Sequence, residues 1–197
     1  KVSVDLTLAE LAEKFAGVAG AGHWAWYHLA KCVKDSESIG ERRNMMAFLS
    51  DSFLYAIGMG LKKPMIRLQA ENRRYKIYLS KRGTLCIKSG AVVPGTSDPD
   101  GDEEYVGCLF QGRFLPNKDR KILPQEQAVL DGLSADPVAF MAQNSKDMSR
   151  CCYCNLPLED KRSKDVGYGS TCAVRWGLPW GKSYDEKVPS FAQIWGN

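Results

Sequence analysis

Three cysteines near the C-terminus constrain this chain most. Cys151 and Cys154 form a C-x2-C pair, a spacing at which one tight turn aims two thiolates at a single tetrahedral ion. Cys172 follows a Gly-Tyr-Gly turn at an expected helix start, and a helix N-terminus favours the thiolate form. Thiolates in this pattern indicate a structural Zn2+ site. The alternative is three buried or merely reduced cysteines in a small, loop-rich subdomain.

The sequence leaves the fourth zinc ligand open. Cys152 is nearest, although adjacent residues rarely reach one ion without strain. Asp160 and Asp165 in the intervening loop offer oxygen ligands, and a water in the fourth position would be an arrangement of catalytic rather than structural sites. Candidates from elsewhere in the fold are His23, His28 and Cys108.

The residues around these cysteines resemble a known domain. The chain runs Cys-x-x-Cys, Leu-Pro-Leu, a charged loop with Ser163, Gly-Tyr-Gly-x-x-Cys-Ala and Gly-Leu-Pro-Trp. This pattern resembles a short zinc-finger-like domain of unknown function that recurs in bacteriophage proteins and at the ends of some phage helicase-like proteins. The resemblance covers Tyr105 to Gly181 at most and is tightest from Cys151 to Ala173. It implies a phage origin and a nucleic-acid setting, and it supplies no activity.

Composition bounds the class of protein. A chain of 197 residues suits one domain or two small ones, and a hydrophobic fraction of 44% is ordinary for a globular protein. Seven cysteines, an odd number, and an N-terminus without a signal-peptide pattern favour a reducing compartment, which we expect to be the host cytoplasm. No apolar run approaches the ~20 residues that span a bilayer, so we expect no membrane partner.

Positive charge concentrates in the middle of the chain. The net charge is +4, yet residues 61–90 hold nine basic residues and one acid, a net charge of +8. A basic strand face that carries an aromatic ring can contact phosphates and stack a base. The candidate nucleic-acid-binding residues are Arg67, Arg73, Arg74, Lys76, Tyr78, Lys81, Arg82 and Lys88. The alternatives are a sheet whose solvent face happens to be basic, or an acidic protein partner.

Hydrophobic periodicity predicts an α+β fold. Its parts are N-terminal helices (1–60), a basic antiparallel sheet plus helix (61–148), and a zinc-finger-like subdomain with a tail (149–197). Strands are expected at 65–68, 75–80 and 84–88 and within 105–115. Within 75–80, Tyr75 should face one side of the sheet, and Lys76 and Tyr78 should face the other. Pro124 and Pro137 indicate the starts of two later helices.

The sequence favours binding over catalysis. It contains no P-loop, no dinucleotide fingerprint, no nucleophile elbow and no His-x-Glu of the zinc deaminases. The leading hypothesis is a phage-type intracellular accessory protein that binds nucleic acid, DNA in preference to RNA, and carries a structural Zn2+. The alternative is a small phage protein that binds and inhibits a host protein, such as a defence protein. A hydrolytic or transfer enzyme with an open zinc position is the third hypothesis.

Overall fold

The computed structural model describes residues 45–80, 84–92, 102–110, 113–178 and 180. Most of the span 1–60 that is expected to be helical, with His23 and His28, lies outside these ranges, as do Lys81 and Arg82. The last part of that span is present as a helix, α3 (Met45–Gly58).

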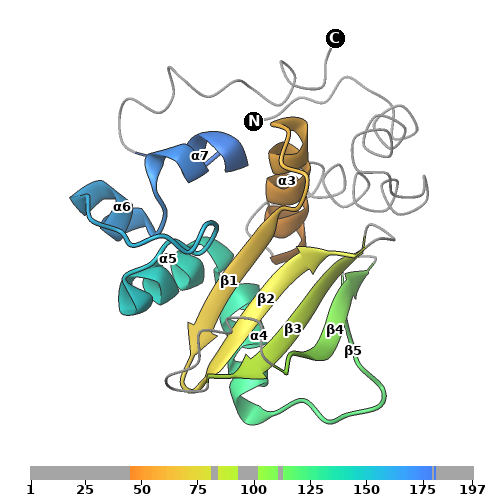
Figure 1. Cartoon of the computed structure of the whole chain (residues 1–197). Helices are drawn as coiled ribbons and strands as arrows, with labels where there is room; N and C mark the ends of the chain where they lie inside the picture. The colour runs from red at the N-terminus through yellow and green to blue at the C-terminus, as the bar shows by residue number, and fades with distance from the viewer. Residues whose placement is uncertain (1–44, 81–83, 93–101, 111–112, 179, 181–197) are drawn as a thin grey trace.

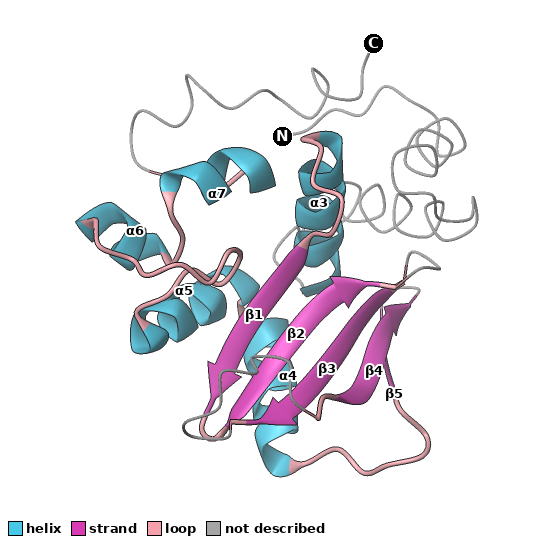
Figure 2. Cartoon of the chain, viewed as in Figure 1, coloured by secondary structure: helices cyan, strands magenta, loops and turns pink. Residues whose placement is uncertain are grey.

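The described residues form an α+β fold, as the sequence predicts. Five antiparallel strands make one sheet in chain order, and five helices pack around it (Figure 2). After α3 the elements are β1 (Met65–Ala70), β2 (Arg73–Leu79), β3 (Leu85–Ala91), β4 (Glu104–Phe110), β5 (Arg113–Pro116), α4 (Pro124–Ala135), α5 (Pro137–Met148), α6 (Lys161–Val166) and α7 (Ser170–Trp176). Every predicted strand region is confirmed, the last as the pair β4 and β5.

Alternating side chains give the sheet a buried face and an outer face. On β2, Tyr75 and Ile77 are buried, whereas Lys76 and Tyr78 are half-buried on the opposite face. Figure 1 shows α4 behind the sheet, and residues of α3 and α4 share a hydrophobic cluster with the buried side chains of the strands. α3 and α4 therefore cover one face, and we call the opposite face the outer face.

Two prolines start consecutive helices. α4 begins at Pro124 and α5 at Pro137, as predicted, because the fixed φ of proline suits the first helical turn. Asp136 caps α5 by accepting the N–H of Ala139 at 3.0 Å. The chain leaves α5 through Ser149 in the left-handed conformation, with φ 53°, which turns it toward the first cysteine of the cluster.

The charged loop between the cysteines contains a helix, α6, that the sequence pattern did not predict. The helix starts after Asp160, whose carboxylate accepts the N–H groups of Arg162 and Ser163 at 2.9 and 3.3 Å. It ends at Gly167, where φ is 86° and an added Cβ would lie 2.8 Å from the Cα of Ala142 on α5. Glycine thus permits both the turn and the close approach of this segment to α5.

One hydrophobic core joins the sheet to the cysteine-rich end of the chain. Its buried cluster includes residues of α3, α4, α7 and four of the strands. Trp176 on α7 packs edge-on against Phe53 of α3, with 5.1 Å between ring centroids, and lies 4.5 Å from the ring of Tyr153. The segment that carries the cysteines is therefore fastened to the rest of the fold. The division of the chain at residues 60 and 148 stays a prediction.

Candidate metal centre and outer sheet face

The structure brings the three cysteines of the sequence motif together. Cys151 and Cys154 stand in a turn after α5, Cys172 lies in the first turn of α7, and their Sγ atoms are all within 4.8 Å of one another. Cys151 and Cys172 are buried, whereas Cys154 is exposed. We call these residues the cysteine cluster. They are close enough to hold a metal ion.

The turn that holds the first two cysteines is closed by the backbone. The N–H of Asn155 donates to the carbonyl of Cys151 at 2.8 Å, and the N–H of Cys151 donates to the carbonyl of Leu156 at 2.9 Å. Asn155 adopts φ 63°, a left-handed conformation that asparagine tolerates better than most residues. This reversal aims both thiols to the same side of the turn.

Hydrogen bonds concentrate negative charge on one sulfur of the cysteine cluster. The thiol of Cys172, and then the backbone N–H groups of Cys154, Gly169 and Tyr153, outweigh burial and lower the pKa of Cys151 to about 5. The same interaction with Cys151, together with burial, raises the pKa of Cys172 far above its usual value. Burial also raises the pKa of Cys154. These hydrogen bonds therefore favour the thiolate form of Cys151, which is the form in which cysteine binds a metal ion.

The candidates for a fourth ligand lie in different places. Cys152 is buried outside the cluster, and burial raises the pKa of its thiol. Asp165 is on the surface of α6, paired with Lys161 at 2.9 Å. Cys108 belongs to the sheet, and His23 and His28 fall outside the described ranges. Within the described part of the chain, the cluster comprises the three cysteines alone.

A hollow of about 280 Å³ opens beside the cysteine cluster. Asp160 and Ser163 line it together with the three cysteines, but both have partners. The carboxylate of Asp160 caps α6, and the hydroxyl of Ser163 accepts the indole N–H of Trp180 at 3.2 Å. All three cysteines thus border this hollow.

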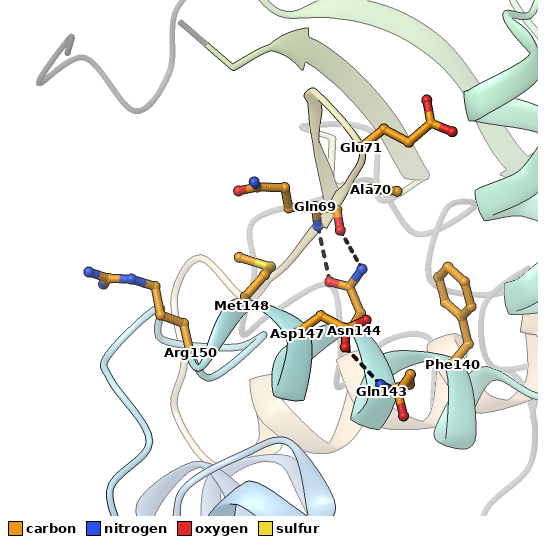
Figure 3. Close-up of a pocket in the computed structure, with 9 residues that line it drawn as sticks. All are labelled: Gln69, Ala70, Glu71, Phe140, Gln143, Asn144, Asp147, Met148 and Arg150. Carbon is orange, nitrogen blue, oxygen red and sulfur yellow. Dashed lines mark hydrogen bonds between the residues drawn. The ribbon is translucent and has the colours of Figure 1, made fainter. Parts of the chain in front are cut away.

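Asn144 docks the cysteine-bearing segment onto the edge of the sheet. Its carboxamide accepts the N–H of Gln69 at 3.0 Å and donates to the carbonyl of Gln69 at 2.6 Å, as Figure 3 shows. The carbonyl of Cys152 accepts the N–H of Arg67 at 2.6 Å. These bonds complete the free edge of β1 in place of another strand. No signal in the sequence marked Asn144, which is a buried amide on an otherwise amphipathic helix.

An open groove of about 640 Å³ lies next to this junction (Figure 3). Its walls carry charges of both signs, from Glu71, Asp147 and Arg150, together with the apolar side chains of Phe140 and Met148. Arg150 donates to the carbonyl of Asn155 at 2.8 Å, which ties this wall to the cysteine turn. The groove presents no single charge or chemistry to a ligand.

Strand register assembles a row of cations on the outer face. Arg67 on β1 is opposite Lys76 on β2, and Lys76 is opposite Lys88 on β3. Residues directly opposed in antiparallel strands project from the same face about 5 Å apart, so three positive charges line up across three strands. We call these residues the cation row. Arg74 projects from the same face of β2, two residues from Lys76.

The cation row keeps a net positive charge. Lys76 pairs with Glu103 at 2.9 Å, and Arg67 donates to the carbonyl of Tyr153 at 3.3 Å. The ammonium of Lys88 lies 5.6 Å from the ring centroid of Tyr78. Like charges directly opposed across a sheet are destabilising, and Glu103 balances only one of the three.

Arg73 lies on the other face, among helix residues. It donates to the hydroxyl of Ser89 at 3.0 Å and lies 3.7 Å from Glu126. Glu126 also accepts from Arg120 at 2.8 Å and from the N–H of Leu123 at 3.0 Å. Burial alone would raise the pKa of Glu126, but these bonds lower it. Arg73 therefore belongs to a buried polar network rather than to the outer face.

Within the described ranges, no helix combines the length and the apolar character that crossing a bilayer requires.

Comparison with known proteins gives one match. Residues 148–177 match the model of a family of unknown function, DUF6011. No curated protein and no solved structure matches the chain. The matched segment holds the cysteine cluster, α6 and α7, so the family pattern and the candidate metal centre coincide. The C-terminal part of the chain is thus similar to a family whose function is unknown.

Proposed function

We propose that this protein is a phage-type accessory protein that binds nucleic acid through the outer face of its sheet. The cation row is the observation that carries the proposal. Glu103 balances only Lys76, so the row keeps a net positive charge, and a phosphate backbone supplies a line of anions that would neutralise it. Arg74 extends the positive surface on β2. We expect DNA in preference to RNA, in the cytoplasm of the host cell.

The cysteine cluster would serve this function as a structural Zn2+ site. Thiolates favour zinc among common divalent ions, and sulfur atoms around a tetrahedral zinc stand about 3.8 Å apart for Zn–S bonds of ~2.3 Å. The Sγ atoms, within 4.8 Å of one another, need only a small contraction to match. The zinc would hold the turn at Cys151 and the start of α7 as one unit. That unit contacts Arg67 through two carbonyl groups, and so it supports one end of the cation row.

Charge reversal on the cation row tests the proposal. Lys76→Glu together with Lys88→Glu should weaken binding to a labelled oligonucleotide by about 10- to 100-fold in fluorescence anisotropy, because two phosphate contacts become repulsive. Lys164→Glu with Lys161→Glu is the matched control, since both side chains are exposed on α6 and the net charge changes equally. Binding that is unchanged by the first pair would refute the proposal. Co-purification of a host protein that resists nuclease treatment would then favour the host-inhibitor hypothesis.

A further inference from the structure

We infer that the nucleic acid bound by this face is single-stranded and lies across the strands, with phosphates on the cation row and unpaired bases on a neighbouring row of tyrosine and cysteine side chains. The inference rests on the proposed function and names the ligand class of the same surface. Its argument starts from the second row.

Strand register places an apolar and aromatic row beside the cation row. Met65 is opposite Tyr78, Tyr78 is opposite Cys86, Cys86 is opposite Cys108, and Cys108 is opposite Leu115. Met65, Tyr78 and Cys86 each stand two positions along their strands from a residue of the cation row, so the rows share one face and run about 7 Å apart. One row is charged and the other carries none.

A bulge brings a second tyrosine to the same face, in line with the cation row. The register of β3 and β4 shifts between Ile87 and Lys88, which places Tyr105 opposite Lys88. From there its hydroxyl hydrogen-bonds to Cys108, and Tyr78 hydrogen-bonds to Cys86. We call Tyr78, Tyr105, Cys86 and Cys108 the tyrosine–cysteine cluster. Tyr78, Tyr105 and Cys108 form the accessible part of this polarisable, largely apolar surface, and Cys86 is buried beneath it.

Exposure of this surface is unusual for large side chains in the described part of the fold. Tyr105 is 37% exposed and Leu115 is 40% exposed, although most large apolar residues in the described ranges are buried. Lys88 lies over the ring of Tyr78 and so connects the two rows. An aromatic surface next to a line of cations matches the two halves of a nucleotide, which are a planar base and a phosphate.

The geometry favours unpaired bases. In a duplex the base faces are stacked within the helix, so tyrosines on a sheet can reach base edges, sugar and phosphate but cannot stack on a base. In a single strand each base can lie against a ring while its phosphate reaches a cation, and stacking on an aromatic side chain strengthens binding by roughly 5- to 150-fold for each base. The second row therefore strengthens binding only when the ligand is a single strand.

Three probes of equal length test the inference with the full chain. They are a single strand, an abasic strand with the same phosphates, and a hairpin duplex, each as DNA and as RNA. Anisotropy at one salt concentration should show at least 5-fold tighter binding of the single strand than of the abasic strand or the duplex. Equal binding of all three would overturn the inference and leave the phosphate contact of the proposed function intact. Binding of none would refute the proposed function itself.

Two double variants test whether the tyrosine rings cause the preference for the single strand. Tyr78→Leu with Tyr105→Leu should bring single-strand binding down to the abasic level while abasic binding changes less than about 2-fold, because the charges stay in place. Tyr78→Phe with Tyr105→Phe keeps the rings and removes both hydroxyls, so it should retain the preference. Retention of the preference in the leucine variant would overturn the inference. If the leucine variant fails to fold, the three-probe comparison on the unmodified chain decides alone.

Discussion

The cysteine cluster and the outer face of the sheet are built in opposite ways. The cluster comes from 22 consecutive residues, Cys151 to Cys172, and two of its three thiols are buried. The cation row comes from Arg67, Lys76 and Lys88 on three strands, and only the register of the sheet aligns them. A local motif therefore carries the chemistry of the first region, whereas tertiary pairing creates the second. Stability should depend on the cluster, and binding should depend on the row.

The largest effect should come from breaking the cysteine cluster. Cys172→Ser should remove bound zinc and lower the free energy of unfolding by more than about 5 kcal/mol, because metal binding and folding are coupled in thiolate sites. Metal analysis and thermal unfolding with and without a chelator measure both changes. Cys108→Ser is the control, since that thiol belongs to the sheet. If the thermal unfolding of the wild-type protein is the same with and without the chelator, the structural role of the metal is contradicted.

Breaking the contact between the cysteine-rich segment and the rest of the fold should have the next largest effect on stability. Trp176→Ala should cost about 3 to 5 kcal/mol, because it leaves a cavity among Phe53, Tyr153 and the rest of the shared core. Denaturant unfolding should still be a single transition in the wild-type protein. Two separate transitions there would show that the cysteine-rich part folds independently, in line with the three-part division predicted from sequence.

Substitution of Glu126, in the buried polar network, should change the stability of the fold rather than binding. Glu126→Gln should destabilise the fold by about 3 kcal/mol at neutral pH, since it leaves Arg120 without its buried charge partner. The folded pKa of Glu126 lies below its usual 4.5, so its contribution is present above that pH and is lost as pH falls through the folded value. The stability gap between wild type and variant should therefore shrink in acid, as measured by urea unfolding from pH 7 to pH 3. A constant gap would contradict this role.

Substitution of Glu103 should have the smallest effect, and it should strengthen binding rather than weaken it. Glu103→Gln removes the acid that pairs with Lys76, so oligonucleotide binding should tighten by about 2- to 5-fold at low salt. Asp131→Asn on the exposed surface of α4 makes the same change in net charge away from the row and should alter binding less. Weaker binding by Glu103→Gln would indicate that this carboxylate contacts the ligand.

The sequence predicted the features that depend on residues close together in the chain. Spacing alone identified the three cysteines that the fold brings together, and Pro124 and Pro137 marked two helices. α6 was missed, although Asp160 offered a cap and Lys161 with Asp165 formed an i,i+4 pair. Both signals were present in the printed sequence.

Features that depend on register were beyond the sequence. Arg73 stands two residues before Tyr75, so extending the predicted alternation by one step assigns it to the buried face. The opposition of Cys86 and Cys108, and the bulge that brings Tyr105 to the outer face, depend on how β3 meets β4. Asn144 could not be recognised either, because its partner is the backbone of a strand 75 residues away.

Salt dependence of binding tests the role of the outer face most directly. Zinc-loaded protein would be titrated with a labelled single-stranded oligonucleotide at several salt concentrations, followed by anisotropy. Three phosphate contacts predict that log K falls with log salt at a slope of about −2, and that the slope becomes shallower in the variant with Lys76→Glu and Lys88→Glu. No binding at low salt, or a slope that is identical in wild type and variant, would contradict the assignment of nucleic-acid binding to this face.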